Sequence, residues 1–122
     1  MVAYTPPGWP SQVRPPGASE WETTATAYLL DCSPPDFRGY RVLQRHPVVL
    51  ARFAALFVAG QRRTAEEGLA EIRTALSGRA PPDVIQAAAE AWAEQSARLA
   101  RTSRAVGLVE SALLGEAFVP RL

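Results

Sequence analysis

The sequence contains no lysine, and only one histidine and one cysteine, among its 122 residues. The absence of lysine excludes a Schiff-base enzyme and a P-loop nucleotide site, because both need that side chain. A single cysteine excludes an internal disulfide bond, and one cysteine with one histidine excludes an ordinary zinc site. We therefore expect no metal and no cofactor.

Targeting and membrane signals are also lacking. Met1–Pro7 has neither the basic region nor the apolar region of a signal peptide. The longest charge-free apolar stretch, Phe53–Gln61, is far shorter than a membrane-spanning helix requires. These observations predict a soluble cytoplasmic protein with no membrane contact. The use of arginine alone as the basic residue, beside abundant alanine, proline and glycine, is typical of a GC-rich bacterial genome.

Proline is concentrated at the start of the chain, where residues 1–18 hold five of the eleven prolines. Proline removes backbone donors and fixes φ, so this arm is predicted to be polyproline-like or turned. Fully extended, it would reach about 55 Å, with Tyr4 and Trp9 as anchors. It either straps onto its own helices, which we favour, or offers a proline-rich ligand to another protein. The chain thus divides into an arm, 1–18, and one helical domain, 19–122.

Two short helices are predicted after the arm. The first begins at a capping box, in which Ser19 is the N-cap and Glu22 bonds back to it. Ser33-Pro34-Pro35 ends it, because the residue before proline avoids the α region. The second is predicted from Pro35 to Arg45. The apolar face of the first helix is formed by residues at helical spacing, namely Trp21, Ala25, Tyr28, Leu29 and Cys32.

Two long helices follow, roughly over 48–77 and 83–115. Gly78 and Gly115 suit their C-terminal ends. The short connection makes the two helices antiparallel, so that the numbers of paired residues sum to about 161. In the second of them, apolar residues recur at a strict seven-residue interval. This heptad series is Ile85, Trp92, Leu99, Val106 and Leu113.

No segment alternates apolar and polar residues over the length of a strand. The predicted fold is all-α: an antiparallel hairpin of two long helices, with two short N-terminal helices packed at one end, preceded by an extended Pro-rich arm. The stretch Val48–Ala59 is apolar nearly all round, with Arg52 as its one charge. It is therefore predicted to be enclosed by neighbouring elements.

Candidates for catalysis are few. Cys32 lies on the apolar face of the first helix, where a small buried hydrophobic side chain is expected, and His46 precedes Pro47 as a residue at a helix end. Asp31 and Asp36 flank a turn and are better explained as residues at a helix end and in a first helical turn. No catalytic or phosphate-loop motif occurs. We predict that the protein is not an enzyme.

Arginine is unevenly distributed, with six residues and no acidic residue between Phe37 and Ala65. The antiparallel register brings four guanidinium groups to one height, where they could bind phosphate or an acidic partner. Glu66, Glu67 and Glu94 fall at the same height and, in the interpretation we favour, neutralise them. The pI of about 8.0 is below that typical of nucleic-acid-binding domains. The predicted anion contacts are Arg62, Arg63, Arg98 and Arg101.

The distal half of the hairpin carries an apolar stripe that two helices alone bury poorly. The short helices cannot cover both ends of the hairpin, so the arm, a second copy or another protein must cover this stripe. We predict a non-enzymatic interaction protein, adaptor, regulatory or structural, that self-associates as a twofold dimer. The alternative is Arg-dependent binding of nucleic acid or another polyanion. The predicted interface comprises Leu69, Ile72, Leu76, Ile85 and Trp92, with Trp9 of the arm.

Several segments also resemble a lineage of bacterial proteins. They are Tyr4–Pro10, Pro15–Gly17 with Trp21-Glu22, Leu29–Asp31, Arg45–Arg52 and Phe118–Leu122. Together they are similar to small helical proteins of actinobacteria. No activity is associated with those proteins, so the resemblance implies a lineage and no function.

Overall fold

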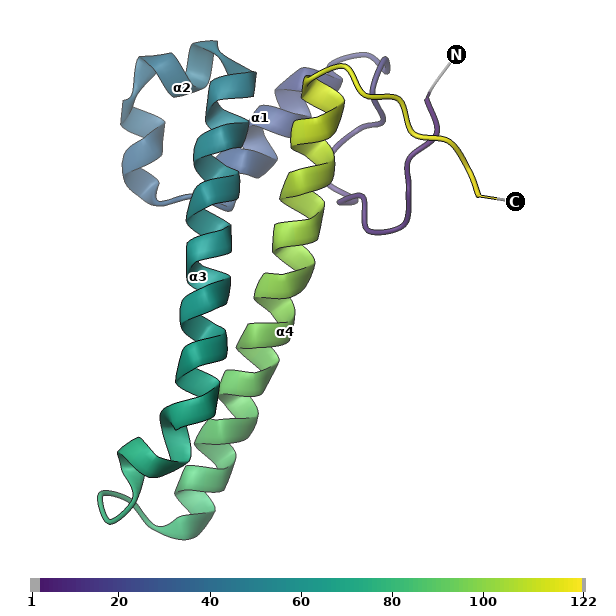
Figure 1. The fold of residues 1–122 in the computed structure, drawn as a ribbon. Coiled ribbons are helices and arrows are strands. Elements are labelled where there is room, and N and C mark those ends of the chain that lie inside the picture. Colours follow the sequence, from purple (N-terminus) through teal and green to yellow (C-terminus); the bar gives the residue numbers. More distant parts are fainter. Residues whose placement is uncertain (1–2, 122) are drawn as a thin grey trace.

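The computed structural model describes residues 3–121 and consists of helices joined by turns (Figure 1). No strand occurs in this range, so the all-α prediction is confirmed. Two long helices dominate the fold, and three short helical segments precede them. In chain order the elements are α1 (Trp21–Asp31), the 3-10 helix η1 (Pro35–Gly39), α2 (Arg41–Arg45), α3 (Pro47–Leu76) and α4 (Pro82–Leu113).

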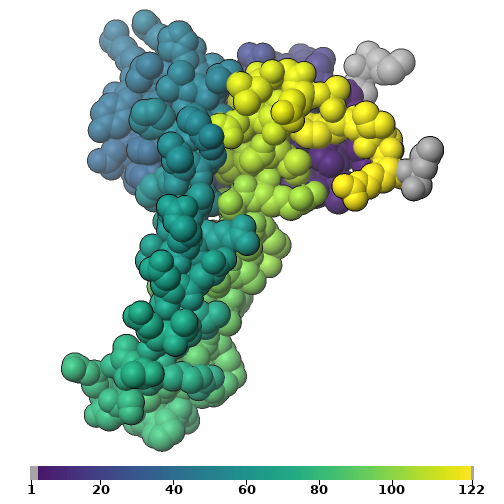
Figure 2. Space-filling model, viewed as in Figure 1, coloured from purple at the N-terminus to yellow at the C-terminus, as the bar shows by residue number. Residues whose placement is uncertain are grey.

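The molecule has a broad head and a narrow stalk (Figure 2). In the head, η1 and α2 lie beside α3, α1 passes behind α3 and α4, and the arm and the C-terminal tail lie on the α4 side (Figure 1). Below the head, α3 and α4 continue alone to the turn that joins them. We call residues 61–98 the stalk and the rest of the described chain the head.

The hydrophobic core lies in the head. Within the stalk, only Ala65 and Ala89 are buried. Two helices present too little surface to enclose large side chains, whereas the short helices and the arm supply the missing cover in the head. The main core cluster is Val13, Ala25, Leu29, Leu30, Leu43, Leu50, Ala51, Ala54, Val58, Val106 and Val109.

The antiparallel register of the two long helices agrees with the prediction. In the head, Nε of Arg52 lies 3.1 Å from a carboxylate oxygen of Glu110. In the stalk, the indole of Trp92 reaches the backbone of Ala65. The residue numbers of the two pairs sum to 162 and 157, within about one helical turn of the value of 161 that the short connection predicts.

The C-terminal end of α4, at Leu113, lies within two residues of its predicted position. Gly115 adopts a φ of +91°, which a residue without Cβ tolerates. Its N–H donates to the carbonyl oxygen of Ala112, and the N–H of Glu116 donates to that of Ser111. These two bonds form a Schellman motif, which satisfies carbonyl groups at the end of the helix.

Two local predictions were wrong. The capping box fails because Glu20 occupies the N-cap position in a left-handed conformation, with a φ of 60°, and no side chain caps α1. The backbone thus reaches the helix through a turn that leaves Ser19 outside it. The predicted helix over Pro35–Arg45 is two segments, η1 and α2, because Tyr40 is extended between them. Gly39, a poor helix former, precedes this break.

The expected enclosure of Val48–Ala59 was also wrong in part. One side of this stretch is fully buried, as at Leu50 and Ala54. The other side is open to solvent, and Leu56 is 62% exposed. The short helices cover only part of the circumference of α3, so an apolar surface remains on the head.

The arm packs on its own helices and does not extend along the stalk. Three of its N–H groups close turns onto Pro6, Pro10 and Pro15, and the N–H of Ala3 lies 3.4 Å from the carbonyl oxygen of Pro16. The arm therefore doubles back, because its prolines fix bends, and it cannot span the 55 Å that an extended chain of about this length would reach. Val13 is buried in the core.

Candidate functional site

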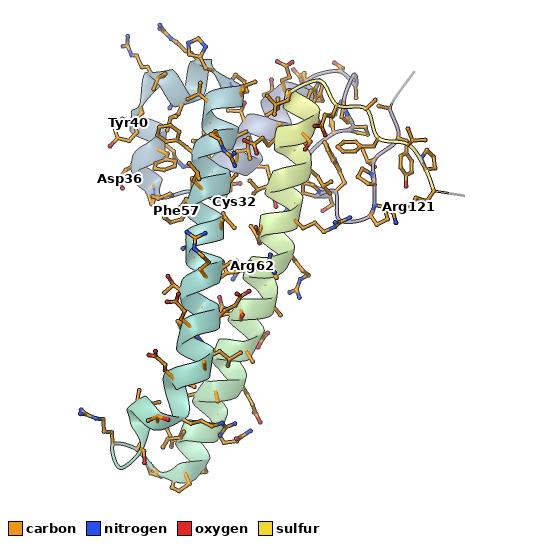
Figure 3. All side chains as sticks on the ribbon, viewed as in Figure 1. Cys32, Asp36, Tyr40, Phe57, Arg62 and Arg121 are labelled. Atoms are coloured by element: carbon orange, nitrogen blue, oxygen red, sulfur yellow. The ribbon has the colours of Figure 1, made fainter. Side chains whose placement is uncertain are left out.

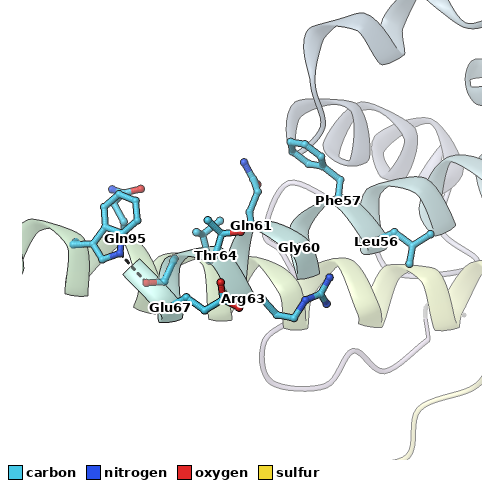
Figure 4. A pocket seen from close by; sticks show the side chains of 11 residues that line it. Leu56, Phe57, Gly60, Gln61, Arg63, Thr64, Glu67 and Gln95 are labelled. Atoms are coloured by element: carbon cyan, nitrogen blue, oxygen red, sulfur yellow. Dashed lines mark hydrogen bonds between the residues drawn. The ribbon is translucent and has the colours of Figure 1, made fainter. Parts of the chain in front are cut away.

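An apolar groove runs along the seam between α3 and α4, where the head meets the stalk (Figure 4). Its volume is about 690 Å³. Apolar side chains lie at both of its ends, and polar side chains lie between them. We call this feature the stalk groove; its lining residues are Leu56, Phe57, Gly60, Gln61, Arg63, Thr64, Ala65, Glu67, Trp92, Gln95 and Leu99.

Trp92 is the largest side chain in the stalk groove and is held by α3. Its indole N–H donates a hydrogen bond of 2.7 Å to the carbonyl oxygen of Ala65. Gly68 makes room for the ring, since a Cβ at that position would lie 2.8 Å from the indole nitrogen. The bond fixes the orientation of the ring, which stays partly exposed. The predicted register of the two helices pairs residue 68 with residue 92. The glycine at position 68 was therefore the sequence signal for this contact.

A second hollow of about 260 Å³ continues the groove toward the tip of the stalk. It shares Trp92 with the stalk groove and adds Ile72 and Leu76. Three of the predicted interface residues are therefore brought together along one surface. Ile85 lines a different hollow at the tip, and Leu69, although 37% exposed, lines neither part of the groove.

Above the groove, four aromatic rings form a cluster that sequence reasoning missed. Phe37 of η1 packs edge-on against Phe53 and Phe57 of α3, with ring centroids 5.9 and 6.2 Å apart. Tyr40 lies 6.4 Å from Phe37 and is exposed. Phe57 also lines the stalk groove, so the exposed aromatic surface of the head and the groove are continuous. The sequence signal for this cluster was the apolar character of Val48–Ala59, which extends nearly all round the helix. A helix that only packs on a core needs no more than an apolar stripe on one face.

The four predicted anion contacts have different surroundings. Arg62, which projects from α3 in Figure 3, forms an ion pair of 3.1 Å with Glu66, as expected for this spacing. Arg63 lines the stalk groove beside Glu67. Arg101 lines a separate hollow under the arm. Arg98 lies near Cys32, where desolvation raises the pKa of the thiol and the positive charge of Arg98 opposes part of that rise.

Trp9, the sixth predicted interface residue, is engaged within its own chain. Its indole N–H donates a 2.8 Å hydrogen bond to the carbonyl oxygen of Val13. Its ring packs edge-on against Phe118 of the C-terminal tail, with centroids 5.9 Å apart. Trp9 therefore holds the arm and the tail together on the head.

Cys32 lies at the C-terminal end of α1 (Figure 3) and is partly buried. Desolvation is the largest effect on its thiol and raises the pKa, although the neighbouring Tyr28 hydroxyl opposes the rise. Desolvation likewise raises the pKa of Tyr28. A thiol whose thiolate is disfavoured is a poor nucleophile at neutral pH. His46, exposed between α2 and α3, lies at a helix end as predicted.

Within residues 3–121, no group of three or more His, Cys, Asp or Glu side chains is placed to hold a metal ion. None of the helices in the described chain is long and apolar enough to span a membrane. No protein-family model matches the chain, no curated protein matches it, and no solved structure matches its fold. The function is therefore inferred from the residues of this chain alone.

Proposed function

We propose that the protein is a non-enzymatic interaction module that self-associates, with the stalk groove of one copy facing that of a second copy. The observation that carries this proposal is the open stalk, where an apolar groove around Trp92 continues to Ile72 and Leu76 with no third helix covering it. A helical pair gains stability when further helices cover its apolar side. A second hairpin supplies two such helices, and cyclic dimers are the commonest oligomers.

The charges along the stalk favour an antiparallel arrangement of the two copies. At the upper end, Arg62, Arg63 and Arg98 are basic, and further down the acidic side chains outnumber the two arginines, Arg73 and Arg79. Parallel copies would place like charges side by side, whereas antiparallel copies place the basic end of one against the acidic part of the other. The acidic residues of the stalk are Glu66, Glu67, Glu71, Asp83, Glu90 and Glu94.

The groove residues show the same complementarity. Arg63 lines the stalk groove at its upper part, and Glu71 lines the lower hollow. A twofold axis midway between them places Arg63 of each copy opposite Glu71 of the other. The same axis brings Ile72 and Leu76 toward the exposed Leu56 at the head of the second copy. Apolar contacts thus form at both ends of the interface, and ion pairs form between them.

Sedimentation velocity at micromolar concentration tests the proposal. The wild type is expected to sediment as a dimer. Leu56→Glu should shift it to monomer, because the substitution adds a charge to the apolar contact at an exposed position that the fold does not need. Leu114→Glu is the matched control, since Leu114 is equally exposed, at 62%, but does not line the groove. It should leave the dimer intact.

A charge exchange tests the arrangement of the copies. Arg63→Glu should weaken the dimer by about tenfold or more, and adding Glu71→Arg should restore it, because the ion pair is rebuilt with reversed polarity. A strictly monomeric wild type contradicts self-association and leaves a foreign helix as the cover. A dimer that Arg63→Glu weakens and the double variant does not restore contradicts the antiparallel register.

We also propose a cytoplasmic location for the protein. Cys32 is a free thiol, and a reducing compartment keeps single thiols free. Alkylation of Cys32 in freshly lysed cells, before any reductant is added, is the expected result. A fraction of the protein disulfide-linked to another thiol would contradict this location.

A further inference from the structure

A hollow of about 500 Å³ lies in the head, between the arm and α4. The arm contributes backbone and polar side chains, α1 contributes one tyrosine, and α4 contributes two arginines. This arm pocket is separate from the stalk groove, with which it shares no residue. Its lining residues are Gly8, Pro10, Ser11, Gln12, Tyr28, Arg101, Thr102, Arg104 and Ala105.

The charged side chains that line the arm pocket are of one sign, namely Arg101 and Arg104. Between Glu94 and Glu110, α4 carries three arginines and no acidic residue. Residues 3–18 of the arm carry one arginine and no acidic residue. No carboxylate lines the pocket. Uncompensated guanidinium groups in a concave site attract an anion, and the walls of the site focus their field.

Arg104 is held in place by the arm. Its Nη2 donates a 3.0 Å hydrogen bond to the carbonyl oxygen of Pro7. Gly8 has a φ of +95°, and a Cβ there would lie 2.6 Å from Nε of Arg104. The glycine thus lets the guanidinium group lie directly against the arm. The other N–H groups of this guanidinium remain available as donors.

Arg101 makes no hydrogen bond or ion pair with any residue in the 3–121 range. Three residues with neutral hydroxyl groups, Ser11, Tyr28 and Thr102, also line the pocket. Burial keeps the pKa of Tyr28 above its usual value, so its hydroxyl retains its proton at neutral pH. Two guanidinium groups with several hydroxyl donors match the oxygen atoms of a phosphoryl group.

We propose that the arm pocket binds a phosphoryl group through Arg101 and Arg104. The group can belong to a small phosphate monoester or to the backbone of a nucleic acid, because the chemistry recognised is the same. This site differs from the predicted anion contacts, of which it keeps only Arg101. It also does not depend on self-association, because no stalk residue contributes to it.

Titration of the ¹⁵N-labelled protein with inorganic phosphate tests the proposal. Saturable shifts are expected for the amide groups of Gly8, Trp9, Ser11 and Gln12 and for those of residues 101–105, and potassium chloride at equal ionic strength should not reproduce them. Arg101→Gln should weaken binding by about tenfold, because it removes one charge-assisted contact. Arg41→Gln is the matched control, since it removes an exposed arginine on α2 outside the pocket. It should bind phosphate as the wild type does.

Arg101→Gln is the deciding variant, because Arg104 also anchors the arm and its replacement can loosen the head. A parallel titration with a short oligothymidylate identifies the source of the phosphoryl group. Tighter binding of the oligonucleotide than of inorganic phosphate, with shifts in the same residues, indicates nucleic acid. Equal or weaker binding indicates a small phosphate monoester. Absence of saturable phosphate shifts in the wild type, or unchanged binding in Arg101→Gln, overturns the proposal.

Discussion

The indole N–H of Trp92 is hydrogen-bonded across the helix pair to the carbonyl oxygen of Ala65, at 2.7 Å. Ala65 lies inside α3, which is held by its own backbone hydrogen bonds. The bond from Trp92 is therefore additional to those of the helix. It links the two helices in the part of the molecule where burial contributes least. Trp92 therefore has a structural role inside one chain as well as a place in the proposed interface.

Gly68→Ala is expected to destabilise the protein. The new Cβ would lie 2.8 Å from the indole nitrogen and 3.0 Å from the neighbouring ring carbons of Trp92, so the ring must shift and lose its hydrogen bond. Overpacking of this kind costs about 1–3 kcal/mol. The better helix propensity of alanine offsets about 1 kcal/mol of it. The net loss is measurable as a lower midpoint in urea unfolding followed by circular dichroism.

Gly107→Ala is the matched control for this prediction. Gly107 also lies within a long helix, but a Cβ there meets nothing within 4 Å. Only the higher helix propensity of alanine then affects the stability, so the substitution should stabilise the protein by up to about 1 kcal/mol. Equal effects of the two substitutions would show that Gly68 is not required by Trp92.

The hairpin could be predicted from sequence because its signals are local and repeated. The seven-residue series from Ile85 to Leu113 fixes one face of α4, and the short connection then fixes its register against α3. That register already pairs residue 68 with residue 92. The contact between Gly68 and Trp92 was therefore available from the sequence, although the hydrogen bond to Ala65 was not.

The head could be predicted only in outline. Proline restricts φ in the arm but does not specify where the chain turns. The sequence therefore has no periodic pattern that predicts the contact between Ala3 and Pro16. The exposure of Leu56 depends on how far the short helices reach around α3, which is a tertiary property. The arm pocket joins Gly8 to Arg104, a pairing across almost the whole chain that spacing alone does not reveal.

Alkaline pH is expected to destabilise the fold through Cys32 and Tyr28. Desolvation, the largest cause, raises the pKa of both groups above their usual values of 9.0 and 10.0. The native state thus holds these protons more tightly than the unfolded chain does. Their contribution to stability is complete below about pH 9 and is lost as the pH rises through the folded-state values. Urea unfolding at a series of pH values measures this loss.

Two variants separate the contributions to the alkaline loss. Cys32→Ala should remove the part that begins near the usual pKa of the thiol, and Tyr28→Phe should remove the part at higher pH. The same burial predicts that a thiol reagent modifies Cys32 more slowly in the folded protein than in urea. Reaction at equal rates in both states would contradict the burial of Cys32.

Trp9→Ala is expected to release the arm and the C-terminal tail from the head. The substitution removes the hydrogen bond to the carbonyl oxygen of Val13 and the edge-on contact with Phe118. Replacing a completely buried tryptophan by alanine lowers the stability by about 3–5 kcal/mol. Trp9 is only partly buried, so we expect a loss near the lower end of this range. Limited proteolysis should then cut residues 3–18 faster than in the wild type.

Tyr4→Ala, at a side chain that is 41% exposed, should change neither the stability nor the rate of cleavage appreciably. Cleavage of the Trp9→Ala arm at the wild-type rate would mean that the turns of the arm, and not this tryptophan, hold it on the helices.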